Sequence, residues 1–148
     1  MVKRVTFTEA EETFMREQRV ARLATADAEG NPHVIPVCYA FDGDRFYTPL
    51  DEKPKRVTKN KLRRVRNIKV RPEVALVIDQ YDDDWSRLGY VLIQGRAELL
   101  SPANASYGKA LLLLRERYAQ YRTMALEKYE VIAITPGHIV SWGPAISK

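Results

Sequence analysis

The side chains of this chain that are best suited to chemistry are cations gathered in one segment, residues 51–71. Between Lys53 and Arg71 this segment holds ten of the 24 basic residues and no acidic residue. The other 14 basic residues face 19 acidic ones, so the rest of the chain has a formal net charge of −5, whereas the whole chain has +5. A positive field confined to one segment of an acidic body indicates an anion-binding site. The ten bases are Lys53, Lys55, Arg56, Lys59, Lys61, Arg63, Arg64, Arg66, Lys69 and Arg71.

The second half of the basic segment has the periodicity of a short helix. Leu62, Val65 and Ile68 recur every three residues, which predicts a narrow apolar stripe on a core and bases that point outward. Thr58 or Asn60 is placed to cap the start of this helix. Unpaired backbone N–H groups and the positive helix end would then lie beside the preceding lysines, which is the outline of a phosphate site.

A basic helix can have three other roles: it can be a solvated surface, it can bind nucleic acid, or it can bind an anionic membrane. The apolar stripe is small and lacks Trp and Phe, which disfavours the membrane. No stacking platform of interleaved aromatic residues accompanies the bases, which disfavours nucleic acid. We therefore expect no nucleic-acid and no membrane partner, while a merely solvated face remains open.

The rest of the chain must hold the basic segment in position. A length of 148 residues and a hydrophobic content of 45% predict a single domain over residues 1–148. The single cysteine, Cys38, cannot form an internal disulfide and is expected as a small buried side chain in a reducing cytosol. No stretch approaches the ~18 uninterrupted apolar residues of a membrane span. A cytoplasmic location is the expectation.

The elements of the chain read as strands joined mostly by turns. Thr8 with Glu11 forms a capping box that predicts a helix over residues 9–18. Gly95 predicts a bulge or a close approach of another backbone, and Pro36 a strand edge or a bulge, in the strands that hold them. The acidic loop at 82–84 lacks the Gly and the distal Glu of a calcium loop, so no metal site is expected. We expect a three-strand meander over 19–26, 33–42 and 45–50, strands over 73–82 and 88–100, a helix opened by Ser101 and Pro102, and a closing pair of strands over 129–136 and 138–143. This order predicts an antiparallel barrel.

Few side chains outside the basic segment could act in catalysis. The sequence contains no nucleophile elbow, metal-binding histidine pair or Cys pair. The two histidines, His33 and His138, are expected as strand residues with satisfied rings. An enzyme built this way would depend on a bound cofactor, with its phosphate at the basic segment. Tyr47, Trp85 and Trp142 stand near expected strand ends, where each either packs in a core or an interface or meets a flat ring.

Five stretches carry a resemblance to a known family: ARLATADAEGNPHVIPVCYAFDGD, YTPLDEKPKR, LRRVRNIKVRPEVALVIDQYDDDW, RLGYVLIQGRAEL and the terminal VSW. From about residue 9 to 142 the chain resembles the flavin-binding split β-barrel proteins related to pyridoxamine 5′-phosphate oxidase, most closely their deazaflavin (coenzyme F420) branch. The resemblance implies a mainly β fold, a split antiparallel β-barrel of the FMN-binding type with helices packed at its ends. It also implies a homodimer that binds F420 or FMN in grooves between the subunits.

The resemblance assigns site residues as well. The family's phosphate-binding motif falls on residues 64–68, so Arg64 matches the principal phosphate position and Arg63 the base before it. Arginine stands where lysine is frequent, and its guanidinium binds phosphate bidentately. Lys53 and Lys55 would suit a longer anionic tail. The full expected cofactor-binding set is Pro36, Val37, Tyr47 and Thr48 at the ring edge, Lys53, Lys55, Lys61, Arg63, Arg64 and Asn67 at the phosphate, and Trp142 closing the pocket.

The function implied is that of an oxidoreductase moving a hydride from reduced F420, or electrons from FMN, to an unsaturated small molecule. No catalytic acid or base is assigned. The residues that bind substrate in the vitamin-forming oxidase are not recognisable, so pyridoxamine phosphate oxidation is not expected. The alternative is a non-enzymatic protein that binds a flavin, a deazaflavin or a haem-breakdown product.

Overall fold

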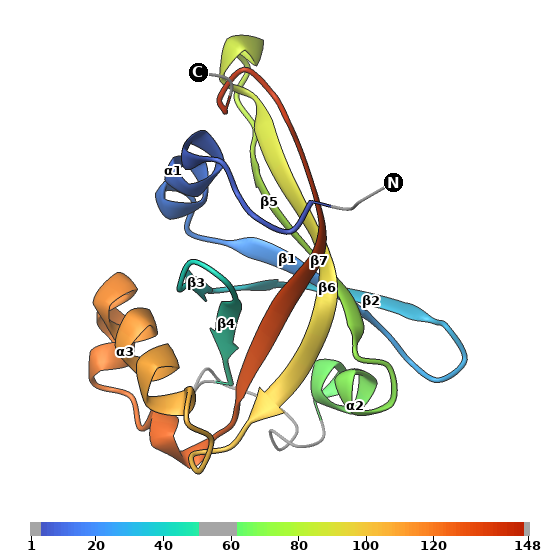
Figure 1. The fold of residues 1–148 in the computed structure, drawn as a ribbon, viewed down its shortest axis with the longest axis vertical. Helices are drawn as coiled ribbons and strands as arrows, with labels where there is room; N and C mark the ends of the chain where they lie inside the picture. The colour runs from blue at the N-terminus through green and yellow to red at the C-terminus, as the bar shows by residue number, and fades with distance from the viewer. Residues whose placement is uncertain (1–3, 51–61, 147–148) are drawn as a thin grey trace.

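The computed structural model describes residues 4–50 and 62–146, in which seven strands form one antiparallel sheet. The strand order is β2-β1-β5-β6-β7-β4-β3, and the sheet curls into a half-barrel (Figure 1). The strands are β1 (Ala21–Ala26), β2 (Pro32–Val37), β3 (Ala40–Phe41), β4 (Phe46–Pro49), β5 (Glu73–Gln80), β6 (Gly89–Leu100) and β7 (Val131–Trp142). The prediction of a mainly β, antiparallel barrel is confirmed.

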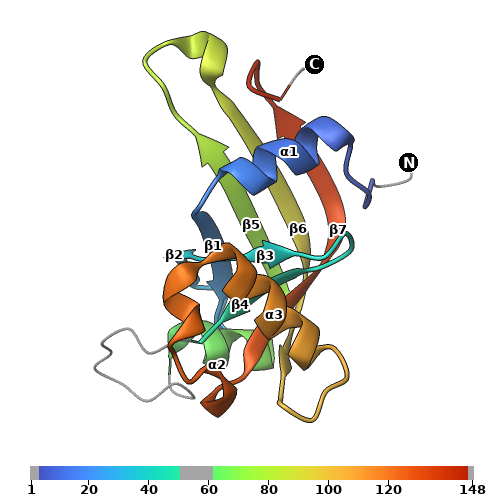
Figure 2. The same ribbon diagram turned by 90° about the vertical axis from the view of Figure 1, so that its left-hand side faces the viewer.

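In the described part of the chain, three helices pack on this sheet and three short 3-10 turns connect its elements. Figure 2 shows α1 and α3 on the same side of the molecule, with the β3–β4 hairpin between them. The helices are α1 (Glu9–Glu17), α2 (Arg63–Val70) and α3 (Tyr107–Arg117), and the 3-10 turns are η2 (Trp85–Arg87), η3 (Ala119–Arg122) and η4 (Leu126–Lys128). Within the described ranges no helix is long and apolar enough to cross a membrane.

The predicted capping box starts α1. The Thr8 hydroxyl accepts from the Glu11 backbone N–H at 3.1 Å, and the Glu11 carboxylate accepts from the Thr8 backbone N–H at 2.9 Å. The same carboxylate pairs with Arg4 at 2.7 Å and accepts from the Ser141 hydroxyl. Burial raises the pKa of Glu11, but the hydrogen bonds from Arg4, Ser141 and Thr8 outweigh burial and lower it to about 2. This carboxylate therefore ties α1 to β7 as an anion.

The predicted three-strand meander is correct in its two hairpins, β1–β2 and β3–β4, but wrong in its middle strand. β1 and β2 pair as expected, with Pro36 on an edge strand, but the predicted strand 33–42 divides into β2 and β3, which lie at opposite edges of the sheet. Tyr39 explains the break, since its ring is 2% exposed and its hydroxyl donates to the Met15 carbonyl of α1 at 2.6 Å. The chain turns toward α1 at Tyr39, so β3 pairs with β4 only.

Two other boundaries differ from the prediction. The expected closing pair of strands is the single strand β7, because β6 pairs with it on both sides of Pro136 and Gly137. The bulge predicted at Gly95 is confirmed as a register shift between Gln94 and Gly95. The helix expected at Ser101 begins only at Tyr107, since turns occupy the residues between.

The hydrophobic core has two parts, one on each face of the sheet. The inner part joins α1 and α2 to the strands, and it includes the predicted stripe of Leu62, Val65 and Ile68, which are 8%, 0% and 4% exposed. The outer part lies under α3, where Leu111 and Leu114 pack on β4 and β7. The inner part holds α2 and the β1–β2 hairpin in place.

Candidate functional site

Helix α2 divides its side chains between solvent and the protein interior. Arg63 and Arg66 are exposed, as predicted, but Arg64 is only 9% exposed and Asn67 3%. The expectation that all the bases point outward is therefore wrong for Arg64. Arg64 stands four residues before Ile68, so it shares the helix face that turns inward. A buried guanidinium is costly unless an anion or hydrogen bonds accompany it, and Arg64 stands where the family resemblance expects the principal phosphate contact.

Hydrogen bonds fix this helix to the β1–β2 hairpin. The Asn67 side-chain N–H donates to the Thr25 hydroxyl at 2.9 Å, and Thr25 is 4% exposed. At the other end, the Arg71 guanidinium donates to the Asp27 carbonyl at 2.7 Å and to the Ala28 carbonyl at 3.0 Å. These contacts hold the hairpin turn and α2 as one unit.

His33 completes the cluster from β2, where it lies opposite Thr25 in the strand register. Its Nδ1 atom is buried and has no hydrogen-bond partner among the described residues. Burial lowers the pKa of His33 below its ordinary value of 6.5, and the charges of Arg63 and Arg64 lower it further. The two guanidinium charges thus act on one neutral, half-buried ring.

The field of these cations reaches the hairpin turn as well. The pKa of Asp27 is lowered, chiefly by hydrogen bonds from Asn31, and the charge of Arg63 acts in the same direction. Two guanidiniums at the start of a helix fit a phosphate group. Lys53, Lys55 and Lys61, predicted for the same site, lie outside the described residues, as do Thr58 and Asn60. The expectation that Thr58 or Asn60 caps this helix is wrong, because the N-cap of α2 is Leu62, without a side-chain cap hydrogen bond.

The ring-edge residues predicted on β2 point to different sides of the sheet. Val37 is 8% exposed and faces the inner core, as do His33 and Thr25. Pro36 is exposed on the outer face. Trp142 lies on this outer face too, 54% exposed, with its ring centroid 6.2 Å from that of Tyr90. Trp142 stands on the outer face at the end of β7, whereas α2 packs on the inner face of the sheet, so one chain alone does not bring Trp142 to α2.

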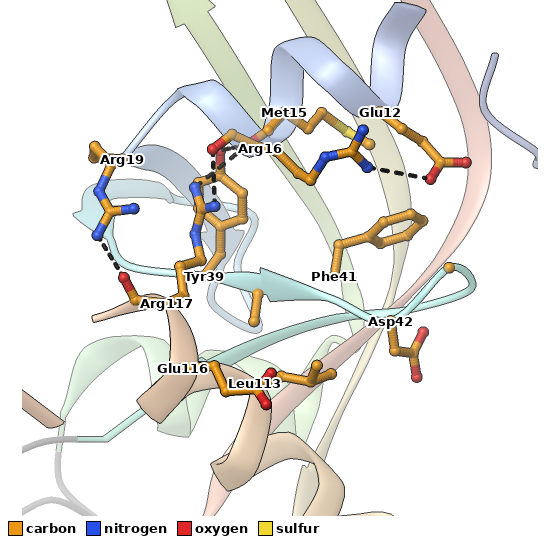
Figure 3. Close-up of a pocket in the computed structure, with 12 residues that line it drawn as sticks. Glu12, Met15, Arg16, Arg19, Tyr39, Phe41, Asp42, Leu113, Glu116 and Arg117 are labelled. Carbon is orange, nitrogen blue, oxygen red and sulfur yellow. Dashed lines mark hydrogen bonds and ion pairs between the residues drawn. The ribbon is translucent and has the colours of Figure 1, made fainter. Parts of the chain in front are cut away.

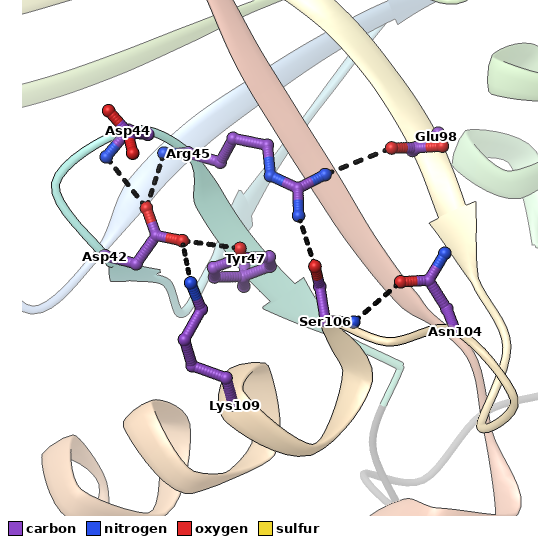
Figure 4. Close-up of polar contacts among 8 residues, drawn as sticks. All are labelled: Asp42, Asp44, Arg45, Tyr47, Glu98, Asn104, Ser106 and Lys109. Atoms are coloured by element: carbon purple, nitrogen blue, oxygen red, sulfur yellow. Dashed lines mark hydrogen bonds and ion pairs between the residues drawn. The ribbon is translucent and has the colours of Figure 1, made fainter.

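Tyr47 and Thr48, the other two ring-edge predictions, are buried in β4 at 0% and 2% exposure. The Tyr47 hydroxyl donates to the Asp42 carboxylate at 2.6 Å, and Lys109 of α3 pairs with the same oxygen at 3.0 Å (Figure 4). Burial raises the pKa of Asp42, but hydrogen bonds from Arg45, Tyr47 and other donors around the carboxylate lower it well below its usual range. The Tyr47 hydroxyl is thus engaged in holding the β3–β4 turn on α3.

A cleft of about 560 Å³ between α1, β3 and α3 was not predicted from the sequence (Figure 3). Its floor includes Tyr39 and Phe41, and Arg117 stands in its wall with the guanidinium 4.7 Å from the centre of the Tyr39 ring. Arg117 also donates to the Arg16 carbonyl at 3.0 Å, which satisfies the end of α1. The lining residues come from distant segments with no common motif, so no sequence signal marks this cleft.

Comparison with known proteins decides the family. The family model for pyridoxamine 5′-phosphate oxidase matches residues 7–143. The chain belongs to the pyridoxamine 5′-phosphate oxidase family. The matched residues run from before α1 to the end of β7, so the family fold includes α2 and the β1–β2 hairpin.

The chain is similar to one curated protein in sequence and to two solved structures in fold. A 5a,11a-dehydrotetracycline/5a,11a-dehydrooxytetracycline reductase from Streptomyces rimosus is 30% identical over 138 residues, which cover 93% of this chain and 83% of the relative. The structure of an F420 reductase superposes with a TM-score of 0.65 at 23% identity, covering 90% of this chain and 98% of that one. A haem storage protein from Vibrio cholerae superposes with a TM-score of 0.70 at 15% identity, covering 91% and 93%. The split-barrel resemblance is confirmed.

Sequence reasoning missed His33 as a member of the site. It treated His33 and His138 as strand residues with satisfied rings. That expectation is wrong for both, because each Nδ1 atom is buried with no hydrogen-bond partner among the described residues. The register of the β1–β2 hairpin decides the placement, because the turn from Asp27 to Asn31 sets His33 opposite Thr25 on the inner face. Turn length and strand alternation were the only available signals.

Proposed function

We propose that this chain is a cytoplasmic oxidoreductase that binds F420, or FMN, with the cofactor phosphate at the start of α2. The observation that carries the proposal is Arg64, a buried guanidinium beside Arg63 and a neutral His33 at the end of the hairpin. Reduced F420, when bound, supplies a hydride, whereas FMN also passes single electrons. Membership of an oxidase family and the likeness to an F420 reductase support a flavin or deazaflavin.

The chain's own residues would bind and orient this cofactor. Arg63 and Arg64 would hold the phosphate, and Asn67 would keep α2 against Thr25 so that the two guanidiniums stay in place. The lysines predicted before α2 would extend the site toward a longer anionic tail. We assign no catalytic acid or base, so the side chains would act by positioning and by excluding water.

The substrate would be an unsaturated small molecule. This part of the proposal is supported by the Streptomyces rimosus relative, whose name describes the reduction of dehydro compounds. Hydride addition to a polarised carbon–carbon double bond needs a flat substrate stacked on the cofactor ring. No nucleic acid or membrane enters this proposal.

A homodimer would complete the site. Apolar side chains remain exposed on the outer face of the sheet, namely Val34 at 61%, Tyr90 at 36%, Val140 at 38% and Trp142 at 54%. The strand register places Pro36, Arg22, Val77, Leu92 and Val140 in one row across this face. A second copy covering the face would bury this apolar surface, and a stable interface of ~1,200–2,000 Å² needs such surface. The predicted contacts of Pro36 and Trp142 with the cofactor ring depend on this dimer.

The second candidate function is that of a non-enzymatic carrier of a flavin, a deazaflavin or a haem-breakdown product. The likeness to the haem storage protein from Vibrio cholerae favours this candidate. A carrier and an enzyme share the binding step and differ in turnover. The discriminating experiment is therefore a titration followed by a turnover assay.

The purified protein is titrated with F420 and with FMN, and the fluorescence of cofactor and tryptophan is followed. Reduced cofactor is then supplied with a panel of unsaturated acceptors. Tight binding with oxidation of the reduced cofactor in the presence of one acceptor class supports the enzyme. Tight binding with no turnover by any donor or acceptor supports the carrier. Binding of neither cofactor refutes the oxidoreductase and leaves only a carrier of a haem-breakdown product.

A further inference from the structure

The cleft between α1, β3 and α3 is a cavity that the proposed cofactor site does not use. Its volume of about 560 Å³ lies within the range of ~300–1,000 Å³ typical of pockets that bind small molecules. Of the described residues of the α2 site, Thr25, Arg63, Arg64 and Asn67 are all absent from its walls. The chemistry of its floor and walls therefore has to be explained separately.

Aromatic rings form the floor of the cleft and are held in place. The ring of Phe41 lies between α1 and α3 and is half-buried (Figure 3). Its centroid is 5.0 Å from that of Phe7 and 4.6 Å from that of Phe46, which fixes its orientation. Arg117 stacks on the Tyr39 ring and bonds to carbonyl oxygens at the end of α1, so it sets the spacing of α1 and α3. A rigid aromatic floor favours a flat ring system, which makes contact over a whole face.

The charged side chains of the walls cancel one another. Among the described residues three arginines and three acidic residues line the cleft, so their formal net charge is zero. Five of the six already have partners within the protein, namely Arg16 with Glu12, Arg19 and Arg117 with backbone carbonyls, and Asp42 with Lys109. A charged ligand would bring a charge that nothing in the cleft balances, which favours an uncharged ligand.

Glu116 is the sixth charged residue and has a free carboxylate. It is exposed on the α3 wall, and its side chain makes no hydrogen bond or ion pair with any part of the chain that the structure describes. An ionised carboxylate only accepts hydrogen bonds, so it would bind an N–H or O–H group of a ligand. Leu113, three residues earlier on the same side of α3, is half-buried and adds an apolar contact.

We propose that this cleft is a second ligand-binding site of the chain, for a flat, uncharged and mainly apolar molecule that carries an N–H or O–H donor. The rings of the ligand would cover Phe41 and Leu113, and its donor would bind Glu116. Removal of this apolar surface from water drives the binding. The inference does not depend on the proposed function, because the two sites share no described residue.

N-Phenyl-1-naphthylamine is a suitable probe, because it is uncharged, combines aromatic rings with one N–H group, and fluoresces more strongly in apolar surroundings. 8-Anilinonaphthalene-1-sulfonate has the same skeleton with an added negative charge and is the matched charged probe. Binding is followed by probe fluorescence and by nuclear magnetic resonance of the methionine methyl groups. Met15 lines the cleft, whereas Met124 lines a different, smaller cavity and is the internal reference.

Two variants of neighbouring leucines test the location. Leu113→Lys places a charge in the wall of the cleft, while Leu112→Lys places the same charge on the same helix at a position that is 59% exposed and outside the cleft. The uncharged probe should bind about tenfold or more weakly to Leu113→Lys and as before to Leu112→Lys, because a charge buried by an apolar ligand loses its hydration. Saturating F420 or FMN should leave the affinity for the probe unchanged.

In the original chain the uncharged probe should shift the Met15 signal and leave Met124 unmoved, and the sulfonate should shift Met15 only at higher concentrations. This measurement needs no variant, so it stands even if Leu113→Lys fails to fold. An unmoved Met15 signal, equal affinity of the two variants, or equal binding of the two probes at Met15 overturns the inference. Displacement of the probe by F420 or FMN overturns it as well, because the cleft would then be part of the cofactor site.

Discussion

The hydrogen bond between Asn67 and Thr25 offers a quantitative test of how α2 is held. Both side chains are buried, at 3% and 4% exposure, and the donor–acceptor distance is 2.9 Å. Asn67→Leu removes the donor and leaves the buried Thr25 hydroxyl without its hydrogen-bond partner. Thr25→Val removes the acceptor and leaves the buried Asn67 amide without its partner. Each single change is expected to cost about 1–3 kcal/mol in the free energy of unfolding, because a buried polar group loses its partner.

The double variant distinguishes this account from simple loss of packing. With both polar groups replaced by apolar groups of similar shape, no buried group is orphaned, so the combined cost should be smaller than the sum by about 0.5–3 kcal/mol. Urea unfolding of the four proteins without cofactor measures these free energies. Costs that simply add would show that the hydrogen bond does not couple α2 to the hairpin, and the reasoning about this unit would fail.

Three further predictions concern stability. The pKa of Glu11 is lowered to about 2 in the folded protein, against ~4.3 in the unfolded chain. Glu11 therefore contributes about 3 kcal/mol to the free energy of unfolding above its unfolded pKa, and this contribution is lost as the pH falls toward 2. Urea melts at several pH values should show Glu11→Gln without this loss, and identical pH profiles would contradict the assignment. Gly95→Ala should cost several kcal/mol in the free energy of unfolding, since its Cβ would lie 2.3 Å from a backbone carbonyl oxygen of β7. The control Gly108→Ala in α3 places its Cβ in open space and should be neutral or raise the free energy of unfolding by about 0.4–1 kcal/mol. Tyr47→Phe removes a donor from the buried Asp42 carboxylate and should lower the melting temperature at neutral pH by an amount equivalent to about 1–3 kcal/mol, and an unchanged melting temperature would show the bond to be dispensable.

Local patterns in the sequence were sufficient for the elements whose stability is local. The capping box of Thr8 and Glu11, the apolar stripe of α2 and the bulge at Gly95 each follow from residue type and spacing, and each is confirmed. A capping box involves residues three apart, and a stripe involves one helix face, so both are readable without knowledge of the rest of the fold. The family resemblance supplied the barrel itself.

The errors share a cause in long-range contacts. The break after β2 depends on Tyr39 reaching the end of α1, and the continuity of β7 depends on pairing with β6 along its whole length. The burial of Arg64 depends on how far the buried face of α2 extends beyond the stripe of Leu62, Val65 and Ile68. The hairpin that packs against the helix decides this width. Contacts between segments far apart in sequence decide all three, and single-sequence periodicity carries no information about them.

The predicted site divides in the same way. Arg63, Arg64 and Asn67 meet at one helix because they are neighbours in the sequence. Pro36 and Trp142 instead lie on the outer face, on strands β2 and β7, where only a second copy would bring a cofactor ring to them. Their roles remain predictions that depend on the proposed dimer.

The central claim is that the inward-facing start of α2 binds a cofactor phosphate, and a matched pair of double variants tests it most directly. Arg63→Ala with Arg64→Ala removes the two guanidiniums that act on His33, while Arg66→Ala with Lys69→Ala removes the same charge from exposed positions of the same helix. Titration of both variants and the original chain with F420 and FMN is expected to show affinity lost by a hundredfold or more in the first variant, about 3 kcal/mol, and nearly unchanged in the second. Equal losses in both variants would mean that only net charge matters, and undiminished binding in the first would contradict the phosphate site.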